Sequence, residues 1–231
     1  MQNTAPKAAP DFFASARFNM IESQLRPNKV IDDKLLDIMG RLPREAFVPN
    51  DQKTFAYTDA DVSVGYGRKM LSPMVLARMI VALALKDNDR VLDIGPATGY
   101  SSAVLNDLAG EVISLESDPA LTRQLQQNKI DFELENTRLV QGNLSDGHAP
   151  ASPYNAIIIQ GAAQWIPEKI TNQLAEGGRM VCVVYPEGDL YGKIGQARLY
   201  TKQARGIIEQ QLFDASAPLL PGFVTRPKFV F

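Results

Sequence analysis

Residues that bind metals or form cross-links are scarce in this chain. Its 231 residues include one cysteine, one histidine and one tryptophan. A single cysteine excludes an intramolecular disulfide, and with a single histidine it offers too few ligands for a typical zinc site. The cysteine, Cys182, lies in the apolar run at residues 180–184, which is typical of a small core residue rather than a nucleophile. The sequence therefore predicts no metal site.

An excess of charge of either sign is also missing. The chain has 24 basic and 26 acidic residues and a formal net charge of −2 at pH 7. Without a strong overall field, the composition does not favour nucleic acid or an anionic membrane as a partner. The sequence shows neither a signal segment nor an apolar run long enough to span a bilayer. We therefore expect a cytoplasmic protein, and both a monomer and a homodimer stay open.

Apolar runs and helical patterns alternate through most of the chain, which predicts an α/β fold. We expect one Rossmann-like, doubly wound domain over residues 1–231, with a mostly parallel sheet that ends in an antiparallel hairpin. Residues 1–75 should form an N-terminal helical cap and a substrate loop, and residues 76–231 the core. Within the first part, residues 62–70 should form a loop. The expected strands are 91–94, 112–115, 137–141, 154–160, 179–184, 196–202 and 207–213, and the expected helices are 12–26, 32–39, 73–85, 100–108, 119–127 and 166–174.

One stretch, R-V-L-D-I-G-P-A-T-G-Y at residues 90–100, predicts a ligand site. The pattern predicts a buried strand with Asp93 near its end, a turn containing Gly95 and Gly99, and then a helix. The free N–H groups and the positive dipole end of that helix point at the turn. In open α/β sheets, ligands bind beyond the carboxyl ends of the strands. The turn is therefore the candidate site.

The charges around this turn indicate which ligand it binds. Its glycines are four residues apart with Asp93 two residues before the first, whereas a dinucleotide fingerprint has the spacing G-x-G-x-x-G. Asp93 repels a pyrophosphate and favours a ligand with an ammonium and a sulfonium, such as S-adenosylmethionine. Glu116 ends the next apolar run about 20 residues beyond the turn, the offset at which a carboxylate receives ribose hydroxyls. A nucleoside site is favoured over the alternative, a plain strand–turn–helix with an incidental surface acid.

Several segments on both sides of the turn match one known family. The most specific is P-R-E-A-F-V-P at residues 43–49, because the glycine turn alone indicates only a methyltransferase. The other matching segments are M-G-R-L at 39–42, A-Y-T-D at 56–59, G-Y-G at 65–67, S-P-M-V at 72–75, Y-N-A-I-I-I at 154–159, I-P-E at 166–168, L-A-E-G-G-R at 174–179 and L-F at 212–213. With these segments the chain resembles the protein-L-isoaspartate O-methyltransferase family. Its members are class I S-adenosylmethionine-dependent enzymes that methylate isoaspartyl carboxylates in damaged proteins.

The resemblance implies a cofactor, a partner and a set of binding residues. The cofactor is S-adenosylmethionine, and the partner is a protein or peptide with isoaspartyl residues. The family holds the cofactor through the glycine turn, the acid after the second strand and an Asp-Gly pair after the third. That pair corresponds to Gly142 and Asn143, whose side-chain amide can still contact the adenine. The implied cofactor-binding residues are Asp93, Gly95, Pro96, Ala97, Thr98, Gly99, Tyr100, Glu116, Ser117, Asn143, Leu144 and Gln160.

The loop implied to contact the methyl acceptor departs from the family pattern. The family has G-x-G-Q-T-I-S-x-P, and this chain has Lys69 and Leu71 at the threonine and serine positions. Leucine offers no hydrogen bond and is expected to add bulk to the cleft. The candidate catalytic residues are Lys69 and Ser72, although Ser72 also fits a helix N-cap. Arg68 and Lys69 together are either a clamp for a carboxylate or a solvated basic pair.

Methyl transfer to a carboxylate needs little from side chains, because the acceptor is already ionised at pH 7 and requires no general base. The leading hypothesis is therefore an S-adenosylmethionine-dependent methyltransferase that acts on isoaspartyl carboxylates. The altered loop leaves two alternatives open: the same transfer to a different, anionic acceptor, or binding of the cofactor without turnover. The same departures predict weak or no transfer to an isoaspartyl peptide.

Overall fold

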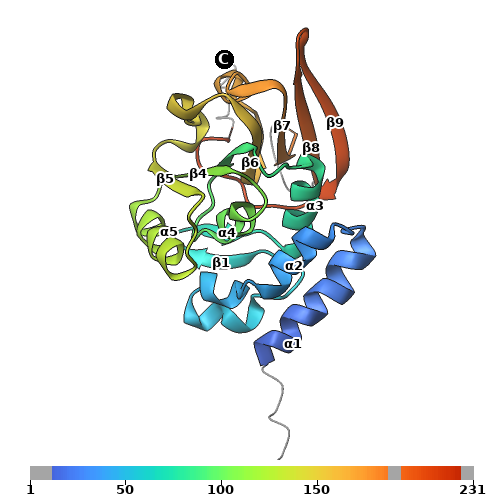
Figure 1. The fold of residues 1–231 in the computed structure, drawn as a ribbon, viewed down its shortest axis with the longest axis vertical. Coiled ribbons are helices and arrows are strands. Elements are labelled where there is room, and N and C mark those ends of the chain that lie inside the picture. The colour runs from blue at the N-terminus through green and yellow to red at the C-terminus, as the bar shows by residue number, and fades with distance from the viewer. Residues whose placement is uncertain (1–11, 187–193, 225–231) are drawn as a thin grey trace, which may run out of the picture.

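A seven-stranded sheet forms the centre of the protein, in the order β5-β4-β3-β6-β7-β8-β9. The computed structural model describes residues 12–186 and 194–224 (Figure 1). The strands are β3 (Arg90–Ile94), β4 (Glu111–Glu116), β5 (Thr137–Gln141), β6 (Tyr154–Ala163), β7 (Leu174–Val184), β8 (Gly195–Gln203) and β9 (Gly206–Ala215). Neighbours from β5 to β7 pair in parallel, and the pairs β7–β8 and β8–β9 are antiparallel. The expected mostly parallel sheet with a final antiparallel hairpin is confirmed.

Helices cover the sheet and form the N-terminal cap, which is blue in Figure 1. They are α1 (Phe12–Asn19), α2 (Asp33–Arg41), α3 (Pro73–Leu83), α4 (Tyr100–Asn106), α5 (Pro119–Asp131) and α6 (Glu168–Thr171). The start of α2 follows the sequence pattern, because the Asp32 side chain accepts a hydrogen bond from Leu35 N at 2.9 Å and caps the helix. Among the helices of residues 12–186 and 194–224, none combines the length and apolar character needed to cross a membrane.

Alternate residues of the central strands form two apolar cores, one on each face of the sheet. On β3, Val91 lies in the first core and Leu92 lies in the second, because successive side chains of a strand point to opposite faces. The N-terminal cap, α3, α4 and α5 cover the first core. The second core is covered by α6 and by the C-terminal segment, residues 216–224. It also contains Cys182, which is buried as predicted.

Residues 62–70, expected to be a loop, form a two-stranded antiparallel hairpin. In this hairpin β1 (Val62–Gly65) pairs with β2 (Arg68–Met70). Burial alternates along β2, so that Arg68 is buried and Lys69 is exposed. The two glycines of the stretch have positive φ angles of 87° and 68° and shape its turn. The glycines therefore mark a hairpin turn rather than irregular structure.

The helix expected at residues 166–174 is much shorter in the structure. The helix α6 covers only Glu168–Thr171, and β7 already begins at Leu174. The carbonyl of Gln173 accepts a hydrogen bond from Tyr154 N at 2.8 Å, which extends the pairing of β6 with β7. Pairing with a neighbouring strand thus overrides the local helical pattern.

Candidate active site

The glycine turn, the acid and the asparagine predicted to bind the cofactor lie at one edge of the sheet. Gly95 N donates to the carbonyl of Leu115 at 2.8 Å, and Gly142 N donates to the carbonyl of Glu116 at 3.0 Å. These bonds continue the pairing of β3 with β4 and of β4 with β5 past the strand ends. Asn143 follows directly and is exposed. Parallel pairing therefore brings together three parts of the chain that are far apart in sequence.

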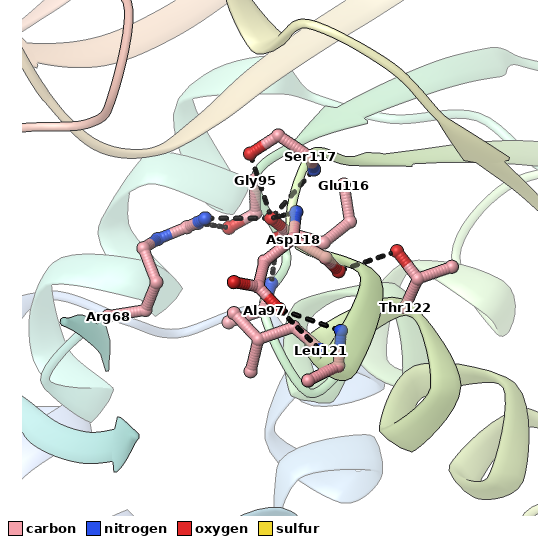
Figure 2. A network of polar contacts seen from close by, with 9 residues as sticks. Arg68, Gly95, Ala97, Glu116, Ser117, Asp118, Leu121 and Thr122 are labelled. Atoms are coloured by element: carbon pink, nitrogen blue, oxygen red, sulfur yellow. Dashed lines mark hydrogen bonds and ion pairs between the residues drawn. The ribbon is translucent and has the colours of Figure 1, made fainter. Parts of the chain in front are cut away.

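Glu116 is held by several hydrogen bonds at the end of β4 (Figure 2). Its side chain is only 1% exposed. One carboxylate oxygen, Oε2, accepts from Ala97 N at 3.0 Å. The other, Oε1, accepts from the backbone N of Ser117 at 2.8 Å and of Asp118 at 3.1 Å. These backbone donors stabilise the buried carboxylate and orient it toward the glycine turn.

The guanidinium of Arg68 also lies on this carboxylate, as Figure 2 shows. Its Nη1 is 2.8 Å from Glu116 Oε1, and its Nη2 donates to the Gly95 carbonyl at 2.7 Å. The Arg68 side chain is 6% exposed, so it is not half of a solvated basic pair. Lys69 is exposed on the opposite side of β2. Successive side chains of a strand point to opposite faces, which separates the two residues. This alternation was not recognised from the sequence because the stretch was expected to be a loop.

Asp93 is fully buried beneath the turn and is bonded within the protein. Its Oδ2 accepts from the hydroxyls of Ser101 and Ser102, each at 2.8 Å, and its Oδ1 accepts from Gln160 Nε2 at 2.8 Å. Burial raises the pKa of Asp93 to about 6, while these hydrogen bonds oppose that shift. The contacts join the start of α4 and β6 to β3. Two residues predicted to bind the cofactor, Asp93 and Gln160, therefore contact each other.

The raised pKa of Asp93 predicts a specific pH dependence of stability. The native protein binds a proton on the Asp93 carboxylate more tightly than the unfolded chain does, in which the pKa of this group is near 3.8. The resulting stabilisation is complete below about pH 4 and is lost as the pH rises through about 6. Relative to Asp93→Asn, which does not titrate, the wild type should lose on the order of 3 kcal/mol of unfolding free energy from about pH 4 to 7. Urea unfolding across this range measures the difference, and parallel profiles would contradict the prediction.

Two other residues of the turn, Thr98 and Tyr100, face the N-terminal cap. Thr98 Oγ1 donates to the carbonyl of Phe47 at 2.6 Å. The Tyr100 ring lies edge-on to that of Phe47, with centroids 5.4 Å apart, and the Arg44 guanidinium lies 4.8 Å over the Tyr100 ring. Both turn side chains are buried. The P-R-E-A-F-V-P segment therefore packs directly on the glycine turn.

Arg44 connects the turn with the loop that precedes α3. Its side chain is fully buried, its Nε donates to the Ala56 carbonyl at 2.6 Å, and its Nη2 donates to the Leu71 carbonyl. Burial lowers the pKa of the guanidinium. Its Nη1 and the Tyr100 hydroxyl have no hydrogen-bond partner among the residues that the structure describes. Arg44 was not singled out from the sequence, although the segment that contains it carries the family resemblance.

The candidate acceptor residues do not converge on the glycine turn. Lys69 points away from it on the exposed side of β2. Ser72 caps α3, because its hydroxyl accepts from Val75 N at 3.4 Å. Leu71 is 2% exposed and packs in the first core, so the expectation that it adds bulk to the cleft is wrong. Its carbonyl accepts a hydrogen bond from Arg44, and burial of its apolar side chain stabilises the fold.

The C-terminal segment closes over the turn from another side. Leu220 N donates to the Ala162 carbonyl at 2.9 Å, which ties the segment to the end of β6. A Cβ placed on Gly95 would lie 3.2 Å from Leu220 Cδ2 and 2.8 Å from Arg68 Nη2. The space next to the first glycine is therefore taken by two side chains, one from the hairpin and one from this segment. The sequence pattern carried no sign of the Leu220 contact.

The acceptor groups at this edge are of the kind that S-adenosylmethionine requires. A buried carboxylate and the Gly95 carbonyl are suitable acceptors for ribose hydroxyls and an ammonium. The remaining predicted residues lie around them: Pro96, Ala97 and Gly99 form the buried turn, Ser117 is partly buried beside Glu116, and Leu144 is buried next to Asn143. Within the part of the chain that the structure describes, no His, Cys, Asp and Glu side chains gather so as to hold a metal ion.

The Rossmann-like sheet with a glycine turn and an acid after the next strand is a nucleoside-binding arrangement, and the family match assigns it to the class I S-adenosylmethionine-dependent methyltransferases. The profile of one family, protein-L-isoaspartate(D-aspartate) O-methyltransferase, matches residues 16–214. The chain therefore belongs to this family and is an S-adenosylmethionine-dependent O-methyltransferase.

Relatives and solved structures agree with this placement. The chain is 35% identical to protein-L-isoaspartate O-methyltransferase 2 of Anaeromyxobacter sp. (strain Fw109-5), over 90% of this chain and 83% of the relative. It is 36% identical to the protein-L-isoaspartate O-methyltransferase of Methylorubrum extorquens (strain PA1), over 96% of this chain and 95% of the relative. A solved protein-L-isoaspartate O-methyltransferase matches with a TM-score of 0.77 at 22% identity, over 90% of this chain and 67% of that chain. This last similarity concerns the fold alone.

A second solved structure adds a ligand to the comparison. It is a Plasmodium falciparum chain described as a protein-L-isoaspartate O-methyltransferase in complex with S-adenosyl-L-homocysteine. It matches with a TM-score of 0.71 at 20% identity, over 89% of this chain and 96% of that chain. The two chains therefore share a fold.

Proposed function

We propose that the chain transfers the methyl group of S-adenosylmethionine to isoaspartyl carboxylates of proteins or peptides. In this proposal the cofactor lies along the turn at residues 95–100, Glu116 and Asn143. The supporting observation is the Glu116 carboxylate, which is buried and held by backbone donors beside the turn. A carboxylate in this place accepts ribose hydroxyls through charge-assisted hydrogen bonds. Family membership supports the isoaspartyl acceptor.

The residues of this edge bind and orient, and they need not transfer protons. A carboxylic acid has an ordinary pKa near 4 and is ionised at pH 7, so no side chain must remove a proton from the acceptor. When bound, the cofactor supplies an electrophilic methyl group on a sulfonium. The chain contributes alignment and exclusion of water, which the buried turn and Leu220 support.

We also propose that the loop before α3 meets the acceptor differently from the family pattern. At the family's threonine and serine positions it has Lys69, which is exposed, and Leu71, which is buried. The hydroxyl of Ser72 is engaged in capping α3. An exposed ammonium on this loop favours an acceptor with negative charge, since opposite charges attract. A different anionic acceptor is therefore the second candidate function.

Titration calorimetry tests the cofactor assignment. S-adenosylmethionine and S-adenosylhomocysteine should bind and NAD should not, because the acids at the turn repel a pyrophosphate. NAD binding without a response to either methionine-derived nucleoside would overturn the proposal. Incorporation of labelled methyl into isoaspartyl and aspartyl versions of one peptide then tests the acceptor. Selective but weak labelling of the isoaspartyl peptide is expected because of the altered loop, and tight cofactor binding without labelling of either would favour another acceptor or a non-catalytic role.

Restoring the family residues, Leu71→Ser with Lys69→Thr, is expected to raise methyl transfer to an isoaspartyl peptide per folded molecule. In the described conformation both side chains point away from the glycine turn, so the gain requires the loop to turn these two positions toward the acceptor, where their hydroxyls offer hydrogen bonds that leucine lacks. The double change should also lower the free energy of unfolding by about 2–4 kcal/mol, because the core loses a buried leucine side chain. Activity is therefore normalised to the folded fraction from urea unfolding, with Lys69→Thr alone as the control. Equal activity in all three proteins would show that these positions do not contact the acceptor.

A further inference from the structure

Arg68 is bonded to the acceptor groups that the cofactor requires. Its guanidinium reaches Glu116 Oε1 at 2.8 Å and the Gly95 carbonyl at 2.7 Å (Figure 2). Both members of the ion pair are nearly inaccessible, with 6% of the Arg68 side chain and 1% of the Glu116 side chain exposed. Leu220 lies next to the same glycine. In this conformation the carboxylate and the turn carbonyl are both engaged.

The bonding of this guanidinium is similar to that expected of the cofactor. S-adenosylmethionine offers hydroxyl donors on its ribose and a positively charged ammonium, and a guanidinium offers N–H donors and a positive charge. The acceptors in question are the same two groups, the Glu116 carboxylate and the Gly95 carbonyl. A cofactor bonded to these oxygen atoms and the Arg68 guanidinium therefore exclude each other.

The position of Arg68 on β2 connects its contact with Glu116 to the loop that precedes α3. The strand ends at Met70, and the carbonyl of the next residue, Leu71, is bonded to Arg44. At the other end of β2 the hairpin turn is open, because a Cβ on Gly65 or Gly67 would meet no atom within 4 Å. The hairpin is thus anchored next to α3 and by Val62, Val64 and Met70, which are buried in the first core, and it has room only at its tip. Withdrawal of Arg68 can move the tip without breaking the Arg44 anchor.

We propose that Arg68 is an internal competitor of S-adenosylmethionine, and that cofactor binding expels it from Glu116 and frees the tip of the β1–β2 hairpin. This inference rests on the proposed cofactor site. The Glu116 carboxylate keeps its bonds from the backbone N of Ala97, Ser117 and Asp118 when Arg68 leaves. These donors continue to stabilise the buried negative charge, and the carboxylate can then accept ribose hydroxyls.

Whether cofactor affinity rises or falls when Arg68 is removed shows whether Arg68 competes with the cofactor or only positions Glu116. An internal contact that closes the site reduces apparent affinity by the fraction of molecules in the open state, so a site open in about one molecule in ten loses about tenfold in affinity. Removing the competitor recovers that factor. If Arg68 instead served only to position Glu116, its removal would loosen the carboxylate and weaken binding.

Calorimetric titration of the full chain with S-adenosylhomocysteine compares the wild type with Arg68→Gln. The control is Arg205→Gln, which makes the same change in net charge at an exposed position between β8 and β9. We expect Arg68→Gln to bind about tenfold tighter than the wild type and Arg205→Gln to bind as the wild type does. Equal or weaker binding by folded Arg68→Gln overturns the inference. Failure of all three proteins to bind overturns the proposed cofactor site instead.

A second measurement follows the wild type, and a variant serves only to assign its signal. The Nε–H resonance of Arg68 is followed by NMR in protein with isotope-labelled arginine, and Arg68→Lys identifies the signal. On addition of S-adenosylhomocysteine we expect this resonance to shift and its exchange with solvent to become faster, because the buried ion pair opens. A resonance that stays unchanged at saturation would rule out expulsion of Arg68.

Discussion

Replacing Arg44 by methionine is expected to lower the free energy of unfolding by about 2–4 kcal/mol. The arginine side chain is fully buried, donates to the carbonyls of Ala56 and Leu71, and lies over the ring of Tyr100. Methionine fills much of the same volume but leaves both carbonyls without their donor, at about 1–3 kcal/mol for each. Removing a desolvated positive charge offsets part of that loss.

The same substitution should reduce methyl transfer more than it reduces cofactor binding. Arg44 anchors the loop at Leu71, whereas the contacts of Glu116 are left in place. Urea unfolding measures the stability change, and calorimetry with a labelled-methyl assay separates binding from transfer. Arg41→Met is the matched control, because Arg41 is exposed in α2 and its surface ion pairs contribute at most about 1 kcal/mol. A loss no larger than that of the control would show that Arg44 does not hold the loop.

Replacing Glu116 by alanine is expected to weaken binding of S-adenosylhomocysteine by about 1.5–3 kcal/mol, or roughly 10- to 150-fold. It removes a buried charged acceptor beside the turn. It also leaves the Arg68 cation buried without its partner and the backbone N–H groups of Ala97 and Ser117 without their acceptor. Breaking a buried pair in this way should lower the free energy of unfolding by about 3–5 kcal/mol. Glu116→Gln retains one acceptor oxygen and should cost less in both measurements.

A double variant separates the two roles of Glu116. The stability lost through Glu116→Ala should be smaller in the Arg68→Gln background, because no buried cation is then left unpaired. Cofactor binding should stay weak in that background, since the ribose acceptor is still missing. Glu111→Ala, at the exposed start of β4, is the control and should bind as the wild type does. If Glu116→Ala bound as tightly as the wild type, Glu116 would not be the ribose ligand.

The predicted part of the site depends on short-range pattern. The apolar run that ends at Asp93, the glycine turn and the acid at Glu116 can each be found within a few residues. Parallel pairing then places all strand ends at one edge, and the pairing of β3 with β4 and of β4 with β5 brings Glu116 and Asn143 to the turn. The N-caps of α2 and α3 were predictable for the same reason, because a cap involves neighbouring residues.

The surroundings of these residues could not be predicted in this way. The sequence gives the identities of Arg68 and Leu71 but does not show in which direction each side chain points. Both positions were interpreted as parts of an open loop, and both are buried, one on Glu116 and the other in the first core. The C-terminal segment reaches the turn through Leu220, which is distant from Gly95 along the chain.

The amino-acid pattern alone was therefore sufficient for the α/β class, the order of its helices and strands in outline, and the family to which the chain belongs. The class and the order of elements follow from helix and strand periods and from turn conformations, which depend on near neighbours, and the family follows from the matching segments around residues 43–49 and the glycine turn. Tertiary structure was needed to show that Arg68 is bonded to Glu116 and to the Gly95 carbonyl, and that Arg44 connects the turn with the loop before α3. A buried cation bonds to whichever acceptors the folded chain brings within reach, and that reach is set by the packing of the whole molecule.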